Sequence, residues 1–237
     1  RFVLDTKANT LRRLQSMVEQ STILDQYTFT VSDWQDAAAD VCETIRCTFD
    51  GDPVIIRSSA LVEDGWDESN AGRFESVLDI PSDDPQHLSS AIKQVIGSYP
   101  DTNPENQVLV QPMIDDVDQS GVVMTRTLET GSPYYVINYD ATTTSTESVT
   151  DGSGKHLQTA IVRKDFVDEG MDVLSDFDDD TASERPQYPN DLLVDPLLTA
   201  IRELEKLIAH DSLDIEFAID RDGQIYVLQA RPMTLDP

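Results

Sequence analysis

The chain is poor in basic residues. Its 237 residues include 17 lysines and arginines against 45 aspartates and glutamates, and only five of the basic residues are lysines. Because no basic stripe is present to meet a phosphate backbone, the composition disfavours nucleic-acid binding. A negatively charged ligand would therefore need a local positive pocket or a metal ion.

Cysteines and long apolar runs are scarce as well. Cys42 and Cys47 stand five residues apart on an expected helix and lack a metal-binding spacing, so we expect two buried free thiols. No apolar run approaches the length of a membrane span and no signal peptide is visible, which predicts a cytoplasmic protein without membrane contact. The first residue is Arg1 rather than methionine, as in an excised fragment.

Aspartate is what the chain has in excess. The formal net charge of −28 is spread along the sequence, with one dense cluster over 176–180, and the hydrophobic content of 39% argues against disorder. Dense salt would screen the repulsion among so many carboxylates. We therefore expect a folded cytoplasmic protein from a high-salt organism.

Apolar spacing predicts both helices and strands. Helices are expected over 6–19, 32–48, 87–99 and 191–210, the second with a capping box formed by Ser32 and Gln35. Strands are expected over 54–57, 74–80, 107–114, 121–128, 134–139 and 157–163, with an irregular acidic segment over 165–190 and a closing hairpin over 214–234. Because the middle third alternates as antiparallel strands do, the pattern predicts an α+β protein. We expect two lobes, residues 1–110 and 111–237, joined near Gln111.

The closing hairpin is the most informative segment. Its two β-rich runs meet at Asp222-Gly223, a dipeptide suited to the positive φ angles of a two-residue turn. In that register Glu216 faces Gln229 and Asp214 faces Arg231, all on one side of the ribbon. The other side is expected to be apolar, with Ile215, Phe217 and Ile219 against Ala230, Leu228 and Tyr226.

This register favours a cation site. Facing side chains lie about 5 Å apart at Cβ, so Glu216 and Gln229 can share one hard cation through oxygen atoms. A surface hairpin with a cross-strand salt bridge is the plainer interpretation of the same register.

Two further features suit an anion. Arg57 leaves a buried strand into a loop of small residues that closes at Ala71-Gly72, where backbone N–H groups can approach a negative charge. Lys7 stands at the start of an expected helix, a position that suits a phosphate better than it suits a cation. Taken singly, each has a plainer explanation: an arginine that caps carbonyl groups, and a solvated lysine.

Together these segments resemble a known family. Seven motifs occur in family order: Lys7, Arg57-Ser58-Ser59-Ala60, Glu63-Asp64, Ser69-Asn70-Ala71-Gly72, Val110-Gln111-Pro112-Met113, Ser120-Gly121-Val122 and Asp214-x-Glu216 with Leu228-Gln229-Ala230-Arg231-Pro232. They resemble the N-terminal nucleotide-binding domain of phosphoenolpyruvate synthase and pyruvate phosphate dikinase, which rifampin phosphotransferases share. The resemblance spans Lys7 to Thr234. It implies an ATP-grasp fold with ATP in the cleft between two lobes.

The resemblance also implies roles for matched residues. Lys7 and Arg57 would hold the ATP phosphates, and a loop with Ser69, Ala71 and Gly72 would fold over the phosphoryl groups.

Further roles follow for the hinge and the hairpin. Gln111 and the backbone of Met113 would receive adenine, and Asp214 would contact the nucleotide side of the site. Glu216 and Gln229 would ligate Mg²⁺. Arg231 would stabilise the phosphoryl group during its transfer. The resemblance thus implies that Arg231, Arg57 and Lys7 are catalytic.

Two departures from the family pattern matter. The usual Gly-Leu-Gly-Glu run is replaced by 136–140 and 148–152, as in the branch that contains the capsule-associated L-glutamine kinase, and Asp140 or Glu147 is the alternative for its glutamate. The family passes phosphate through a histidine on a swivelling domain, but His87, His156 and His210 lack the Thr-His setting of that motif. The domain that carries the histidine is therefore expected elsewhere, either in cis or in trans.

The final phosphoryl acceptor stays open among pyruvate, a glutamine amide and an antibiotic hydroxyl. A non-catalytic nucleotide sensor or a structural domain of a larger assembly is the rival from another class. Carboxylate–amine ligase chemistry is a second enzymatic alternative, because the ATP-grasp fold alone does not decide between reactions.

Overall fold

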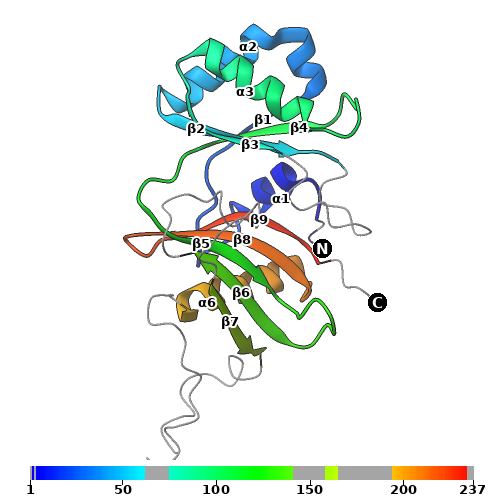
Figure 1. Ribbon diagram of the computed structural model, residues 1–237, viewed down its shortest axis with the longest axis vertical. Coiled ribbons are helices and arrows are strands. Elements are labelled where there is room, and N and C mark those ends of the chain that lie inside the picture. The colour runs from blue at the N-terminus through cyan, green and yellow to red at the C-terminus, as the bar shows by residue number, and fades with distance from the viewer. Residues whose placement is uncertain (1, 3, 62–74, 141–157, 165–193, 234–237) are drawn as a thin grey trace, which may run out of the picture.

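Two β-sheets, each with its own helical layer, make up the protein (Figure 1). The computed structural model describes residues 2, 4–61, 75–140, 158–164 and 194–233. Both sheets are antiparallel throughout their described strands. The predicted α+β class is therefore confirmed. No helix among the described residues is long and apolar enough to cross a membrane.

The first sheet has the strand order β1-β4-β2-β3. Its strands are β1 (Tyr27–Thr30), β2 (Pro53–Ser59), β3 (Ser76–Pro81) and β4 (Gln107–Pro112). Two helices, α2 (Val31–Phe49) and α3 (Pro85–Gly97), cover one face, where Ile56 and Val110 pack against Ile45 and Ile92. Because strand side chains alternate, Arg57, Ser59 and Leu109 point to the opposite face.

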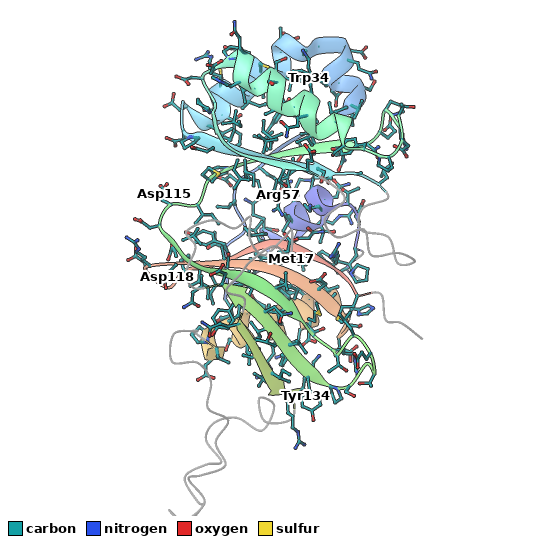
Figure 2. All side chains as sticks on the ribbon, viewed as in Figure 1. Met17, Trp34, Arg57, Asp115, Asp118 and Tyr134 are labelled. Carbon is teal, nitrogen blue, oxygen red and sulfur yellow. The ribbon has the colours of Figure 1, made fainter. Side chains whose placement is uncertain are left out.

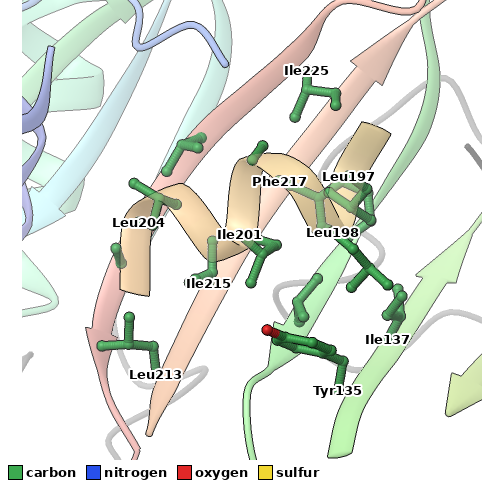
Figure 3. Close-up of a cluster of buried hydrophobic side chains, with 14 of the residues drawn as sticks. Tyr135, Ile137, Leu197, Leu198, Ile201, Leu204, Leu213, Ile215, Phe217 and Ile225 are labelled. Carbon is green, nitrogen blue, oxygen red and sulfur yellow. The ribbon is translucent and has the colours of Figure 1, made fainter. Parts of the chain in front are cut away.

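The second sheet has the order β7-β6-β5-β8-β9. Its strands are β5 (Val117–Met124), β6 (Tyr134–Asp140), β7 (Gln158–Arg163), β8 (Leu213–Asp220) and β9 (Ile225–Pro232). Helix α6 (Val194–Ile208) packs its Leu197, Ile201 and Leu204 stripe on Tyr135 and Phe217 (Figure 3). Each fully buried Leu or Ile in such a core contributes about 1.5–3 kcal/mol.

Helix α1 (Lys7–Leu14) belongs to the core of the second sheet. Its Ala8, Leu11 and Leu14 are fully buried in the cluster that contains the inner face of β8 and β9. Leu109, from the first sheet, enters the same cluster. The division at residue 110 stays a prediction, and α1 lies with the sheet that follows that boundary.

Local sequence accounts for most elements, with some corrections. The capping box of α2 is formed by Thr30 and Asp33, two residues before the predicted pair, and α1 ends at Leu14 instead of residue 19. Strand β1 was not predicted. Both thiols are free, but Cys47 is exposed and only Cys42 is buried. Five residues correspond to about 500° of helix rotation, which turns Cys47 away from the core.

The closing hairpin keeps its predicted pairs at the far end but not near the turn. Glu216 faces Gln229 and Asp214 faces Arg231, as predicted. The turn, however, has three residues, with Gly223 at φ +82° and Asp220 facing its closing backbone partner Gln224.

A bulge in β9 compensates for this longer turn. Leu228 is the extra residue, because the register shifts between Glu216 and Phe217. Val227 and Ile225 therefore oppose Phe217 and Ile219 in the core, where Leu228 and Tyr226 were predicted. Those two side chains pack instead in a small cluster with Val117 and Ala218.

Candidate active site

The polar face of the β8–β9 hairpin meets the first sheet at Arg57. Figure 2 shows this side chain between β2 and the hairpin below it. Arg57 is only 5% exposed, and its Nη2 donates to Oε2 of Glu216 at 2.8 Å. Its Nη1 donates to the main-chain oxygen of Leu228 at 2.7 Å. One guanidinium thus binds both strands of the hairpin.

Glu216 is surrounded by positive charge. Burial by itself raises the pKa of this carboxyl, but the charges of Arg57, Lys7 and Arg231 outweigh burial and hold the pKa below its ordinary value. The Glu216 carboxylate is therefore ionised at neutral pH. Three positively charged side chains, from β2, α1 and β9, stabilise this charge.

Asp214 and Arg231 form a second, mostly buried ion pair. Both Nε and Nη2 of Arg231 donate to Oδ2 of Asp214, at 3.0 and 2.7 Å. Among the described residues, Oδ1 of Asp214 is buried without a hydrogen-bond partner. Burial raises the pKa of Asp214; the charge of Arg231 opposes this rise, and Glu216 adds to it.

Glu216 and Gln229 present oxygen ligands at one point of the sheet. They face each other across β8 and β9, and Gln229 is 2% exposed. Carboxylate and amide oxygens suit Mg²⁺, which proteins hold through one or two carboxylates with substrate phosphates completing its coordination. No cluster of three or more His, Cys, Asp or Glu in the described part of the chain could hold a metal. The pair fits a cation shared with a ligand.

Lys7 begins helix α1, as predicted, and is 5% exposed. The first amides of the helix already have partners, because Ala8 N–H donates to Ser59 Oγ at 3.0 Å and Asn9 N–H donates to Thr6 Oγ1 at 3.3 Å. Those two amides donate to the protein itself. The lysine side chain is thus the feature of this helix start that suits an anion.

Gln111 and Met113 lie at the end of β4 and just beyond it. Gln111 is 1% exposed, and within the described residues neither its Oε1 nor its Nε2 has a hydrogen-bond partner. Unsatisfied buried amide groups are costly, so this side chain is suited to a polar ligand. The N–H of Met113 donates to the oxygen of Pro53 at 3.0 Å, so this amide already has a partner within the protein.

Other predicted residues divide between described and undescribed positions. Ser69, Ala71 and Gly72 lie outside the described residues, as do Glu147 and His156. Asp140, the other alternative for the family glutamate, ends β6 opposite Ser120 and is 1% exposed.

Two groups that contribute to the site were not predicted from the sequence. The carbonyl of Leu228 is a backbone atom released by a bulge, and no side-chain pattern marks it. Ser59 could have been found, because alternation along β2 puts it on the same face as Arg57.

A comparison with protein families identifies the chain. The family described as pyruvate phosphate dikinase, AMP/ATP-binding domain, matches residues 5–237. The chain belongs to this family. No curated protein matches this dikinase-family domain.

The fold of the dikinase-family domain is ATP-grasp, and one solved structure with a TM-score above 0.5 supports this. D-alanine–D-alanine ligase from Helicobacter pylori is 13% identical, with 96% of this chain and 53% of the ligase covered at a TM-score of 0.51. D-alanyl-alanine synthetase A from Vibrio cholerae is 12% identical, with 95% and 54% covered and a TM-score of 0.47. PH1788 from Pyrococcus horikoshii is 15% identical, with 97% and 89% covered and a TM-score of 0.48. The domain spans about half the length of the two ligase-type enzymes.

Proposed function

We propose that this domain binds ATP with Mg²⁺ between its two lobes and activates one of its phosphoryl groups for transfer to a histidine. The histidine would lie on a separate swivelling domain, in cis or in trans, and would feed a small-molecule acceptor such as a glutamine amide or pyruvate. The observation that carries the proposal is the convergence of Lys7, Arg57 and Arg231 on Glu216. Such a cluster matches a polyphosphate bound with a metal ion.

Nucleotide binding is assigned to residues of both sheets. Lys7 and Arg57 would hold phosphate oxygens, under the loop that contains Ser69, Ala71 and Gly72. The buried amide of Gln111 and the backbone of Met113 would contact adenine, a role supported by the two unpartnered atoms of Gln111 among the described residues. Asp214, with its buried Oδ1, would contact the nucleotide as well.

Glu216 and Gln229 would hold Mg²⁺. When bound, the metal would neutralise charge on the phosphate oxygens. The low pKa of Glu216 supports this assignment, because a ligand carboxylate must be ionised. Since Glu216 now pairs with Arg57, ligand binding would require the two side chains to share or exchange partners.

Transfer itself needs no nucleophile from this domain. The phosphoryl group becomes metaphosphate-like as it leaves, and its charge spreads over the equatorial oxygens. Lys7, Arg57 and Arg231 would stabilise that charge, while both lobes fix the orientation of the nucleotide. Arg231 is the cation assigned to the transition state.

The departures in the sequence support a finer assignment. We propose that the domain lies closest to the capsule-associated L-glutamine kinase branch, on the basis of the segment 136–140 where Gly-Leu-Gly-Glu is usual. The acidic composition supports a cytoplasmic protein in a high-salt cell.

Calorimetric titration tests the proposal. ATP with Mg²⁺ is titrated in molar KCl into the wild-type chain, Glu216→Gln and the control Glu43→Gln, whose exposed side chain pairs with Arg46. We expect saturable binding by wild type and control, and binding that is lost or no longer metal-dependent in Glu216→Gln. Folded wild-type protein that binds no nucleotide, or a Glu216 variant that binds as wild type does, would contradict it.

A further inference from the structure

Helix α1 is attached to both sheets. Its body is buried in the core of the second sheet through Ala8, Leu11 and Leu14. Its first turn is instead hydrogen-bonded to strands of the first sheet, far away in sequence. The helix therefore joins the two lobes at its first turn, where Lys7 lies.

Two side chains of the first sheet hold this turn. Ser59 Oγ accepts from Ala8 N–H at 3.0 Å, and Gln107 Oε1 accepts from the Thr6 hydroxyl at 2.7 Å. Ser59 and Gln107 face each other in the pairing of β2 with β4. The residues on either side of Lys7 are thus fixed by one cross-strand pair.

The hydrogen bond to Ser59 is buried, and the one to Gln107 is partly buried. Ser59 is 0% exposed and Thr6 is 4% exposed. A buried N–H that loses its acceptor keeps the cost of its desolvation, so the turn is strongly held in one place. Ser59 also lies two residues after Arg57, which places both side chains on one face of β2.

From these contacts we infer that Ser59 and Gln107 are positioning residues, which hold the first turn of α1 so that the Lys7 ammonium group acts together with Arg57 beside Glu216. The inference rests on the proposed function for its ligand, ATP. Strand β2 then determines the position of two positive charges in the site. It carries Arg57 itself, and it holds Lys7 in place through Ser59. The effect of Lys7 on the carboxyl of Glu216 supports this placement.

A structural role alone would give a different result. If Ser59 merely capped the helix, its loss would lower stability without regard to the lysine. Ser58 is the matched control, because it is equally buried, on the same strand, and alternation turns its side chain toward the helical layer.

The first test needs no nucleotide. Acetic anhydride labels lysines of the native chain, and mass spectrometry compares Lys7 with the exposed Lys93 as internal standard. We expect Ser59→Ala and Gln107→Leu to raise the labelling of Lys7 several-fold over Lys93, and Ser58→Ala to leave it unchanged. Unchanged labelling of Lys7 in both variants would overturn the inference whatever the ligand is.

The second test is a double-mutant cycle on Mg-ATP affinity, with Ser59→Ala and Lys7→Met singly and combined. We expect Ser59→Ala to weaken binding about tenfold in the wild-type background and hardly at all beside Lys7→Met. Equal losses in both backgrounds, with wild-type binding intact, would overturn the positioning role alone. Absence of binding by folded wild-type protein would instead contradict the proposed function, and with it the role of Lys7 toward ATP.

Discussion

Arg57 and Glu216 come from different sheets and form an ion pair of 2.8 Å, with side chains 7% and 16% exposed. The proposed metal ligand is therefore also a contact between the lobes. Removing one partner of such a pair leaves the other charge buried, which costs more than the pair itself contributes. Stability and the proposed ligand binding would thus depend on the same two side chains.

Replacement of Glu216 should destabilise the protein in a pH-dependent manner. The folded-state pKa is lowered, so the stabilisation is fully present above the ordinary value of 4.5 and is lost as the pH falls through the folded pKa. We expect Glu216→Gln to lower the free energy of unfolding by about 2 kcal/mol at pH 7 and by less in acid. Urea denaturation between pH 7 and pH 3 measures this, with the exposed Glu105→Gln as control; a pH-independent difference would contradict it.

Asp214 should show the opposite pH dependence. The folded-state pKa of Asp214 is raised. Its contribution to the free energy of unfolding is therefore fully present below the ordinary value of 3.8 and is lost as the pH rises through the folded pKa. We expect the destabilisation caused by Asp214→Asn to be largest in acid and smaller at neutral pH. The same urea series measures it, and a profile that parallels that of Glu216→Gln would show that burial does not dominate at this carboxyl.

Arg231 should matter more for transfer than for binding. Its main partner on the proposed mechanism is the charge of the transition state, so its loss should affect the rate selectively. With the histidine-bearing domain present, we expect Arg231→Met to slow phosphoryl transfer about 100-fold and to change the Kd for Mg-ATP less than about threefold. Labelled ATP follows the transfer, and Arg221→Met, an exposed turn residue, is the control. Equal losses in Kd and in rate would assign Arg231 to ground-state binding.

Gly121 should not tolerate a side chain. A Cβ there would lie 2.8 Å from Cε1 of Phe217, and would also meet the main-chain oxygen of Asn138. We expect Gly121→Ala to cost about 1–3 kcal/mol in the free energy of unfolding. Gly97→Ala is the matched control, because nothing lies within 4 Å of a Cβ at that position. Equal stabilities of the two variants in urea would contradict this packing.

Salt should stabilise the fold. The formal net charge is −28, and the screening length falls from about 10 Å at 0.1 M salt to about 3 Å at 1 M. We expect the Tm to rise by at least about 5 °C between 0.1 and 2 M KCl. Sucrose, which is excluded from protein surfaces but screens no charge, is the control. A rise of the same size in sucrose alone would argue against charge repulsion as the cause.

The hairpin shows how far the sequence predicts this site. The register of an assumed two-residue turn, together with alternation along the strands, placed Glu216 beside Gln229 and Asp214 beside Arg231. The turn type was wrong, because Asp222-Gly223 suits both two-residue and three-residue loops. The predicted pairs at the far end held because the bulge at Leu228 offset the longer turn.

Long-range contacts explain the remaining misses. The hydrogen bond between Ser59 and Ala8 joins residues 51 positions apart, and neither residue carries a local signal for it. Strand β1 has only four residues and leads directly into α2, so its alternation is too short to recognise. The capping box was displaced because Thr30 and Ser32 both have capping side chains, and tertiary packing selects between them.

The turn and the bulge together constrain how the length of this hairpin can vary. A deletion of one turn residue would leave a two-residue turn between Asp220 and Gln224 and would keep Glu216 opposite Gln229. Deletion of Leu228 would keep that pairing too, but it would remove the bulge and the carbonyl to which Arg57 donates. Natural deletions in this hairpin are therefore expected to fall in the turn and to spare the bulged residue, even where its identity drifts.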